Sequence, residues 1–360
     1  MSWSGVIGHR HVVERFRRGF QRDRLGSAYL FVGPRGVGKH TFARQLAKTL
    51  FCEQVTAEAF DACGQCQSCR LAEAGSHPDL LLVSKREDKS VFSIDLIVGE
   101  DEERLRTGLC HDIYLKPLVA TRKIAILNDA DLFNDESANA LLKTLEEPPP
   151  RAMIILIGTT RERQVRTIQS RCQTVNFPPL SEDEVVAVLS RLPDLESPVE
   201  KSELAAICQG SVAQALLLTD SVSYDFRKEW LQRLATLDPW ADGGGKCVIG
   251  YSEVDGKEAG SRRDRLLFAA DVSLLFYRAL LDHWSKLFNH PRDQQLTQAV
   301  TQAAGLWQRP WAALVDCIDR TIEFQRQIPT NVGAANAVED WLIDLARLAA
   351  PRQVTGALSR

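Results

Sequence analysis

The sequence predicts an α/β domain of the P-loop class, followed by a region that is helical throughout. Three observations support this prediction. A short apolar run, Ala28–Val32, leads directly into the glycine-rich segment GPRGVGKHT at residues 33–41. The next segment, Thr41–Leu50, has helical periodicity, which completes a strand–loop–helix unit. From Tyr224 onward, the apolar residues follow helical spacing almost without interruption.

Three more apolar runs belong to the first block, which we assign to residues 1–178. They are Leu80–Val83, Ile124–Leu127 and Met153–Ile157. Short apolar runs separated by helical patterns are typical of a parallel sheet that helices cover on both faces. We therefore expect a parallel sheet in this block.

Two helical blocks are predicted to follow. Ser181 and Glu184 form a capping-box pattern, which predicts the first helix of a small domain over residues 179–222. Residues 223–360 form the second block, in which the glycine-rich stretch 241–260 is predicted to be a mobile surface loop. Apolar residues spaced by three and four then predict one long amphipathic helix through Leu267, Ala270, Leu274, Tyr277, Leu281, Trp284 and Phe288.

Composition limits the classes of function. The chain has 360 residues and a net charge of −3, so no overall basic field attracts it to nucleic acid, and we find no basic stripe. A DNA contact would have to be local or made through partners. No apolar run reaches the length of a bilayer-spanning helix, and the N-terminus lacks the apolar core of a secretory signal. We expect a cytoplasmic protein with reduced thiols.

The glycine segment fits a phosphate-binding loop at Gly33, Gly38 and Lys39. The backbone N–H groups of such a loop form an anion-binding nest, and the lysine supplies a charge to the phosphates. Together with Gly36 and Thr41, these residues form the predicted nucleotide site. The alternative is a glycine turn that contains a lysine by chance.

The predicted ligands for Mg²⁺ are incomplete. His40 stands where the loop should carry a hydroxyl, and Thr41 lies about 100° further round the helix. At the end of the strand near residue 127, Asn128 and Asp129 occupy the positions of a metal-binding Asp and a catalytic Glu. A shifted register makes Asp129 the ligand but leaves Ala130 at the position of the base. Because Mg²⁺ requires oxygen ligands, binding of this ion is doubtful and hydrolysis should be nearly absent.

Four cysteines predict a metal module at about residues 52–69. Cys63, Cys66 and Cys69 form a C-x2-C-x2-C run, with Cys52 upstream. Four thiolates suit a closed, structural zinc site. An iron–sulfur cluster is the alternative, and the short polar loop favours zinc.

In their order, these motifs resemble a known family. The glycine loop, the cysteine cluster, ANALLKTLEEPP (138–149), IGTT (157–160) and SRC (170–172) resemble subunits of the bacterial DNA polymerase III clamp loader, over roughly residues 1–220. The resemblance implies the AAA+ class: an α/β nucleotide-binding domain, a helical lid and an all-α C-terminal collar. It also implies partners, namely gamma/tau and delta subunits and, through the complex, the sliding clamp and primed DNA.

Two types of subunit share these motifs, the gamma/tau ATPase motor and the delta-prime stator. The motor carries Thr and Asp-Glu where this chain has His40 and Asn128-Asp129, and a lid arginine where it has Ala213. These departures make the chain most similar to delta-prime, in which ATP binding is possible and turnover is small. An active motor subunit is the alternative. A stand-alone zinc-binding DNA protein is disfavoured by the acidic balance.

Arg171 is the residue to which the resemblance assigns a catalytic role. In this family, the arginine of the SRC motif points into the nucleotide site of a neighbouring subunit as an arginine finger in trans. The alternative is a surface arginine in a solvated turn. Thr159 or Thr160 occupies the sensor-1 region. Glu146 and Glu147 end a helix stopped by proline, either near the subunit interface or on a solvated face.

Overall fold

The computed structural model describes residues 3–86, 91–100, 106–192, 195–197, 199–254, 259–285, 292–328 and 333–350. It divides into two compact units, Met1–Asp194 with Cys208–Ala213, and Leu195–Ile207 with Gln214–Arg360. Residues 179–222, which the sequence predicts to be one small domain, are therefore divided between the units. None of the helices in the described ranges combines the length and the apolarity needed to cross a bilayer.

The first unit is built on a parallel five-stranded sheet with the strand order β2-β3-β4-β1-β5. Its strands are β1 (Ala28–Val32), β2 (Leu80–Val83), β3 (Lys123–Leu127), β4 (Ala152–Ile157) and β5 (Gln173–Asn176). The predicted parallel sheet is confirmed, and each of the four apolar runs is a strand. The fifth strand was not predicted, because it pairs only with β1 at the edge of the sheet and buries only Val175.

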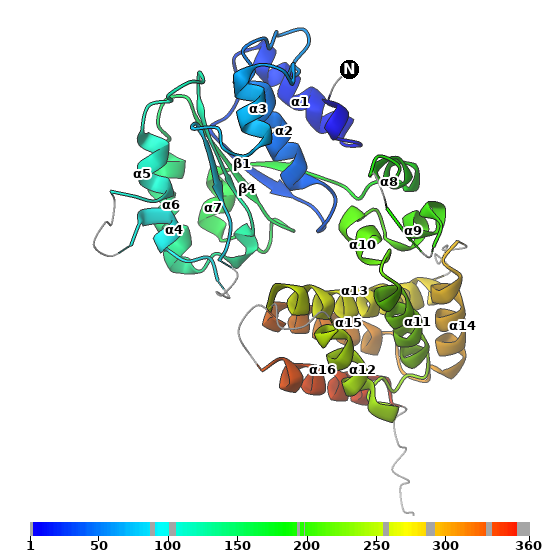
Figure 1. Ribbon diagram of the computed structural model, residues 1–360. Coiled ribbons are helices and arrows are strands. Elements are labelled where there is room, and N and C mark those ends of the chain that lie inside the picture. The colour runs from blue at the N-terminus through cyan, green and yellow to red at the C-terminus, as the bar shows by residue number, and fades with distance from the viewer. Residues whose placement is uncertain are drawn as a thin grey trace, which may run out of the picture. The chain divides into compact units, whose positions relative to one another are not determined.

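Helices cover both faces of this sheet (Figure 1). The first unit contains η1 (Trp3–Gly5), α1 (Arg10–Gln21), α2 (Lys39–Phe51), α3 (Gln67–Glu73), α4 (Asp95–Val98), α5 (Leu109–Tyr114), η3 (Ala130–Leu132), α6 (Asp135–Glu146) and α7 (Arg166–Arg171), and α8 (Glu182–Leu189) follows the last strand. One face packs Phe31 against Phe16 of α1 and Phe42 of α2. The other face packs Leu30 and its neighbours against α4 to α7, including Leu141 of α6. Since successive strand residues point to opposite faces, β1 is buried along its whole length.

The predicted capping box begins α8. Ser181 Oγ accepts a hydrogen bond from the Glu184 backbone N–H at 3.2 Å, and the Glu184 carboxylate accepts one from the Ser181 N–H at 2.9 Å. Two of the helix's orphan donors are thereby satisfied.

The second unit is helical. Its helices are α9 (Lys201–Ile207), α10 (Val212–Leu217, whose first two residues belong to the first unit), α11 (Ser221–Ala235), η4 (Ala241–Gly243), α12 (Gly244–Glu253), α13 (Ala259–Trp284), α14 (Gln294–Leu306), α15 (Ala312–Gln327) and α16 (Ala334–Ala349). The predicted long helix is confirmed as α13 as far as Trp284, while Phe288 lies outside the described residues. In the core, Trp341 stacks on Phe324 with ring centroids 4.2 Å apart, and the Trp230 indole donates a hydrogen bond to Ser273.

The predicted mobile loop at residues 241–260 is wrong for residues 241–254 and for residues 259–260, which begin α13, while residues 255–258 lie outside the described residues. Residues 241–253 form η4 and α12, and Val254 follows as a turn. Gly244 allows this close packing, because a Cβ there would lie 1.7 Å from the Pro239 carbonyl oxygen. Tyr251 is buried and stacks on Phe226 at 3.9 Å, so tertiary packing outweighs the weak helix propensity of the glycines.

Candidate functional site

The glycine loop lies between β1 and the N-terminus of α2, as the sequence predicts. Gly38 caps the helix in the left-handed region, with φ of 95°, and Lys39 is the first helical residue. Lys39 is buried, and its Nζ donates hydrogen bonds to the carbonyl oxygens of Gly33 at 2.5 Å and Pro34 at 2.6 Å. Burial lowers the pKa of Lys39 to about 8, against an opposing contribution from the charge of Asp131. The lysine amine is thus already engaged by carbonyl groups of its own chain.

Asp131 is a site residue that sequence reasoning missed. Its carboxylate accepts hydrogen bonds from the backbone N–H of Thr159 at 2.8 Å and from the side-chain amide of Gln164 at 2.5 Å. The Thr159 hydroxyl oxygen is buried and has no hydrogen-bond partner among the described residues. Asp131 follows the carboxyl end of β3, where loops of neighbouring parallel strands meet, and that position was the signal available in the sequence.

The three predicted magnesium positions do not form an oxygen site. His40 offers an imidazole, whose pKa is lowered by burial. The Asn128 amide donates a hydrogen bond to Ser84 Oγ at 3.3 Å, and Asp129 is exposed in a left-handed conformation with φ of 57°. One carboxylate, one engaged amide and one imidazole do not fit Mg²⁺, which prefers several oxygen ligands. Thr41 is exposed on α2 and does not replace the missing hydroxyl.

The tip of the glycine loop contacts residues 211–213 of the same unit. The Val212 N–H donates a hydrogen bond to the Gly36 carbonyl oxygen at 3.0 Å. A Cβ at Gly36 would lie 2.2 Å from Ser211 Oγ and 2.6 Å from the Ala213 side chain, so only glycine fits at this position. Ala213, which stands at the predicted place of a lid arginine, therefore packs directly on the loop as a small apolar contact.

The four predicted cysteines converge at the C-terminal end of α2. The Sγ atoms of Cys52, Cys63, Cys66 and Cys69 all lie within 4.8 Å of one another. Backbone N–H groups point at these sulfurs, as in the hydrogen bonds from the Cys66 N–H to Cys63 Sγ at 3.4 Å and from the Cys69 N–H to Cys66 Sγ at 3.4 Å. Such donors stabilise the thiolate of Cys63, the form that binds metals, whereas burial raises the pKa of Cys52 and of Cys69.

The cluster fits a single metal ion. Zinc–sulfur bonds of about 2.3 Å place tetrahedral sulfurs roughly 3.8 Å apart, and Cys63 Sγ lies 4.0 Å from Cys69 Sγ. Hydrogen bonds from the backbone N–H groups of Cys66 and Gln65 lower the pKa of Cys63 to about 6. In a four-iron cluster, each thiolate binds a different iron, which would spread the sulfurs further apart. The four cysteines can therefore hold one ion between them.

Arg171 is the last residue of α7, and its guanidinium is held by neighbouring groups. Nε donates to Glu146 Oε1 of α6 at 2.8 Å, and Nη2 donates to the same oxygen. Nη1 donates to the Thr167 carbonyl at 2.9 Å and to Ser170 Oγ at 3.1 Å. The side chain nevertheless remains 30% exposed. The arginine is thus oriented by its own chain without being buried.

These features define the class of the first unit. A parallel sheet in the order β2-β3-β4-β1-β5, with a glycine loop between β1 and α2 and polar residues at the carboxyl ends of β3 and β4, is the P-loop architecture of AAA+ domains.

Comparison with known proteins shows which family within this class the chain resembles. Residues 8–181 match the family model described as DNA polymerase III, delta subunit. The delta' subunit of DNA polymerase III from Bacillus subtilis is 36% identical over 208 residues, which cover 58% of each chain. The tau/gamma subunit from Haemophilus influenzae is 34% identical over 224 residues, 61% of this chain and 30% of that one. Over its N-terminal part, the chain is therefore similar to clamp-loader subunits of DNA polymerase III.

The predicted resemblance to this family is thereby confirmed, and both of its subunit types appear among the relatives. The chain spans less than two thirds of the length of either curated relative. A solved gamma subunit-related protein of Thermotoga maritima aligns over 94% of this chain and 99% of its own, at 16% identity and a TM-score of 0.40. That likeness is too distant to separate the two types.

Proposed function

We propose that this chain is the non-motor, delta-prime type of clamp-loader subunit. It hydrolyses little or no ATP itself and presents Arg171 to the nucleotide site of a neighbouring gamma/tau-type subunit. The proposal is supported by a contrast between the residues at this chain's own magnesium positions and Arg171. The residues at His40, Asn128 and Asp129 do not fit Mg²⁺, whereas the Arg171 guanidinium is oriented and partly exposed.

The domain roles and partners follow from the same proposal. Residues 1–178 form the AAA+ domain, 179–222 the lid and 223–360 the collar through which the ring assembles. The partners are gamma/tau and delta subunits, and the assembled complex places the sliding clamp on primed DNA in the cytoplasm. ATP binds only weakly through Gly36, Gly38 and Lys39, because residues 211–213 cover the tip of the loop and Lys39 already binds loop carbonyls.

The metal of the cysteine module is proposed to be structural zinc. Four sulfur ligands form a closed set with no position left for a substrate, which is the arrangement of structural and not catalytic zinc. The module lies directly after α2, so the ion would fix the end of the helix that follows the glycine loop.

An active motor subunit is the second candidate. The tau/gamma relatives and the intact residues Gly33, Gly38 and Lys39 favour it. It requires a metal-binding arrangement other than the usual hydroxyl and carboxylate.

Steady-state ATPase measurements on the assembled complex test the proposal. Arg171→Ala should lower turnover by about 10³-fold, the lower end of the range for arginine fingers, because charge on the transferred phosphate loses its partner. Lys39→Ala in this subunit should leave turnover unchanged. Both variants should assemble normally, as gel filtration would verify.

An ATPase measurement on the purified chain alone can contradict the proposal. Turnover near ~1 s⁻¹ by the chain alone, lost on Lys39→Ala, would establish the motor alternative. Unchanged turnover of a complex that contains Arg171→Ala would rule out the finger.

A further inference from the structure

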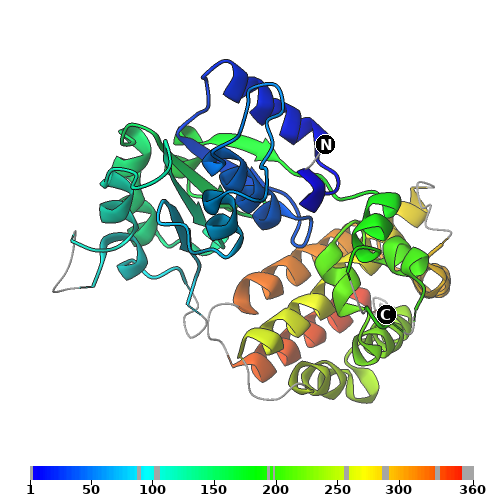
Figure 2. The same ribbon diagram turned by 45° about the horizontal axis from the view of Figure 1, so that its top comes forward.

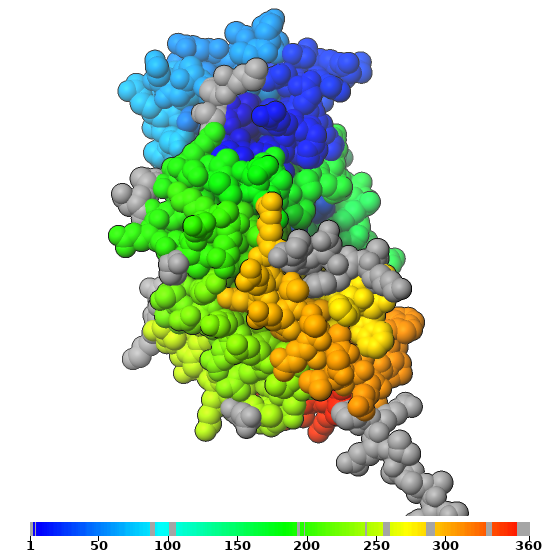
Figure 3. Space-filling model, turned by 90° about the vertical axis from the view of Figure 1, so that its right-hand side faces the viewer, coloured from blue at the N-terminus to red at the C-terminus, as the bar shows by residue number. Residues whose placement is uncertain are grey.

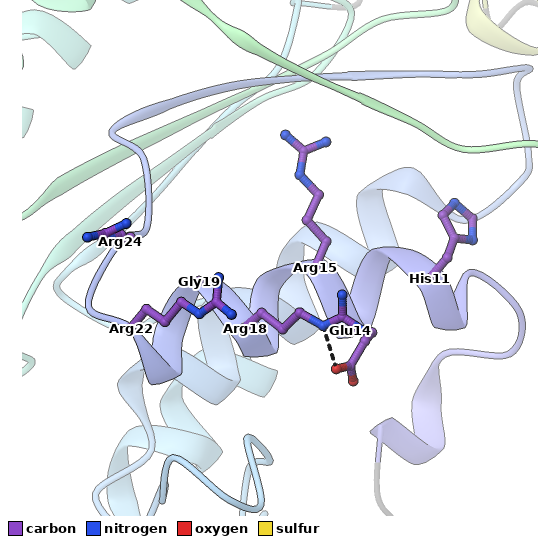
Figure 4. Close-up of a pocket in the computed structure, with 7 residues that line it drawn as sticks. All are labelled: His11, Glu14, Arg15, Arg18, Gly19, Arg22 and Arg24. Atoms are coloured by element: carbon purple, nitrogen blue, oxygen red, sulfur yellow. Dashed lines mark hydrogen bonds and ion pairs between the residues drawn. The ribbon is translucent and has the colours of Figure 1, made fainter.

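The outer face of α1 carries a basic surface hollow. The hollow has a volume of about 470 Å³ and is lined by His11, Glu14, Arg15, Arg18, Gly19, Arg22 and Arg24. Figure 4 shows Arg18, Arg22 and Arg24 toward one end of α1 and His11 toward the other, with Arg15 between them. In the space-filling view, the dark blue N-terminal segment that includes α1 forms part of the surface of the first unit (Figure 3). We call this feature the α1 hollow.

The sequence builds the α1 hollow from one amphipathic helix and the turn after it. Val12 and Phe16 are buried in the core, so the opposite face of the helix points to solvent. The chain then folds back, because the Arg24 N–H donates a hydrogen bond to the Gly19 carbonyl oxygen at 2.8 Å. This turn adds Arg24 to the arginines of the helix. The prediction that the chain lacks a basic stripe is therefore wrong, since the stripe is completed only by the fold.

The edge of the sheet borders the same surface. The Arg15 guanidinium donates a hydrogen bond to the Thr174 carbonyl oxygen of β5 at 3.0 Å, and Figure 2 shows α1 beside this bright green strand. The contact fixes Arg15 through one of its five N–H donors and leaves the others available.

The charges of the α1 hollow are not balanced locally. Four arginines stand against the single carboxylate of Glu14, which leaves three positive charges, whereas the whole chain carries −3. Glu14 pairs with Arg18 at 3.0 Å and with Arg17 at 3.5 Å. Within the described part of the chain, neither Arg22 nor Arg24 has an acidic partner within 4.0 Å. A merely solvated helix face usually intersperses both signs of charge, so this excess indicates an anionic ligand.

We propose that the α1 hollow binds the phosphate backbone of duplex DNA. Guanidinium groups bind phosphate oxygens with two parallel hydrogen bonds. A DNA duplex presents phosphates at regular intervals along its backbone. From His11 to Arg22 the helix extends about 16 Å, at 1.5 Å per residue, which is the rise of roughly five base pairs. The lining contains no Phe, Tyr or Trp on which unpaired bases could stack, and this favours a duplex over a single strand.

This inference rests on the proposed function, which brings the subunit to primed DNA, and it names the surface that this chain contributes. The contact would be independent of sequence, because backbone phosphates carry no base information. It would also be independent of the Arg171 finger, which belongs to α7 and α6.

The test is fluorescence anisotropy with a labelled blunt DNA duplex and the full-length chain at several salt concentrations. Arg22→Glu combined with Arg24→Glu should weaken binding at least tenfold at low salt. It should also reduce the slope of log K against log salt by about two, one for each phosphate that an arginine no longer neutralises. Lys228→Glu with Arg278→Glu is the matched control, since it changes two exposed basic residues of the second unit and alters the net charge equally.

Three results would overturn the inference. They are no binding of duplex by the wild-type chain at low salt, equal losses in the two double variants, and weakened binding of poly-glutamate with unchanged binding of duplex. The last result would indicate an acidic protein surface as the ligand. Circular dichroism must show that both variants are folded. ATPase of the Arg171→Ala complex, measured without DNA, reports on the proposed function separately, so the two failures are distinguishable.

Discussion

Two regions of the first unit differ in how far their charged side chains are exposed to solvent. Around α2, the charge of Lys39 is buried against loop carbonyls, and the cysteine thiols after the helix point at one another. At the α6–α7 contact, the Arg171 guanidinium is oriented by Glu146 but stays partly exposed. A charge that is buried among groups of its own chain affects the chain's own stability, and burial of the Lys39 charge lowers it. A partly exposed charge can be reached by another molecule, as the proposed role of Arg171 requires.

This difference predicts that the stability of the chain and the turnover of the complex can be changed separately. Changes around α2 should alter the free energy of unfolding and leave the turnover of the assembled complex intact. Changes at the α6–α7 contact should do the reverse. Three experiments test this separation, beginning with the largest expected effect.

Loss of the metal should be the most destabilising change. Structural zinc supplies about 10 kcal/mol or more of apparent folding free energy in small domains, so Cys66→Ser should cost at least several kcal/mol here. For a unit of this size, that loss corresponds to a fall in melting temperature of roughly 10 °C. Metal analysis and thermal unfolding would measure both effects.

Cys247→Ser is the matched control for this change, because Cys247 is partly buried and lies outside the cluster. It should retain the metal. Protein purified without chelator that contains no zinc, or a Cys66→Ser variant as stable as the wild type, would contradict the assignment.

Titration of Lys39 should change the free energy of unfolding by less than loss of the metal does, and this free energy should increase as the pH rises. Burial lowers its pKa to about 8 from a usual 10.5, so between these values the unfolded chain binds more protons than the folded one. The free energy of unfolding should therefore rise with pH across this window, by about 2 kcal/mol between pH 8 and pH 10. Lys39→Met removes that contribution, so denaturation at both pH values should show the wild type gaining stability relative to the variant.

The exposed residue Lys143 provides the comparison, since Lys143→Met should differ from the wild type equally at both pH values. A pH-independent difference for Lys39→Met would mean that the buried amine does not titrate in this range. The turnover of the complex should be the same with either variant.

The sequence predicted the centre of the sheet well and its edge poorly. Strands β1 and β4 are buried at every position, so their apolar runs are unambiguous. By contrast, β5 has the sequence QTVN and buries one side chain, because only one of its sides is paired. The helix α12 was missed for a related reason. Its glycines favour a loop locally, and only the packing of Tyr251 and Val248 in the fold selects the helix.

The candidate site was predicted where the residues are adjacent in sequence and missed where the fold brings them together. Lys39 and the four cysteines follow fixed motif spacings. Asp131 gains its role only through bonds to Thr159 and Gln164, which lie about thirty residues further along the chain. Likewise, the sequence alone does not decide whether Glu146 lies near a subunit interface or on a solvated face. Its bond to Arg171 crosses from α6 to α7 and cannot be deduced from either segment alone.

Glu146 therefore offers the finest test of the contrast. Glu146→Ala frees a guanidinium that otherwise has one dominant orientation. The pair is partly exposed, so its contribution is limited to about 1 kcal/mol, and turnover of the complex should fall by roughly three- to tenfold. The loss should appear in kcat with KM for ATP unchanged, because Glu146 orients the finger and does not bind nucleotide. Stability of the chain should change by no more than about 0.5 kcal/mol.

Two further variants isolate the orientation effect. Glu146→Gln keeps an oxygen that can accept a hydrogen bond from Arg171, so it should recover part of the lost turnover. Glu147→Ala removes the neighbouring exposed carboxylate and should have no effect. An increase in turnover with Glu146→Ala would mean that the glutamate restrains the finger and does not present it. Equal effects of Glu146→Ala and Glu147→Ala would mean that both residues belong to a solvated face. Glu146 of α6 would then not determine the orientation of Arg171.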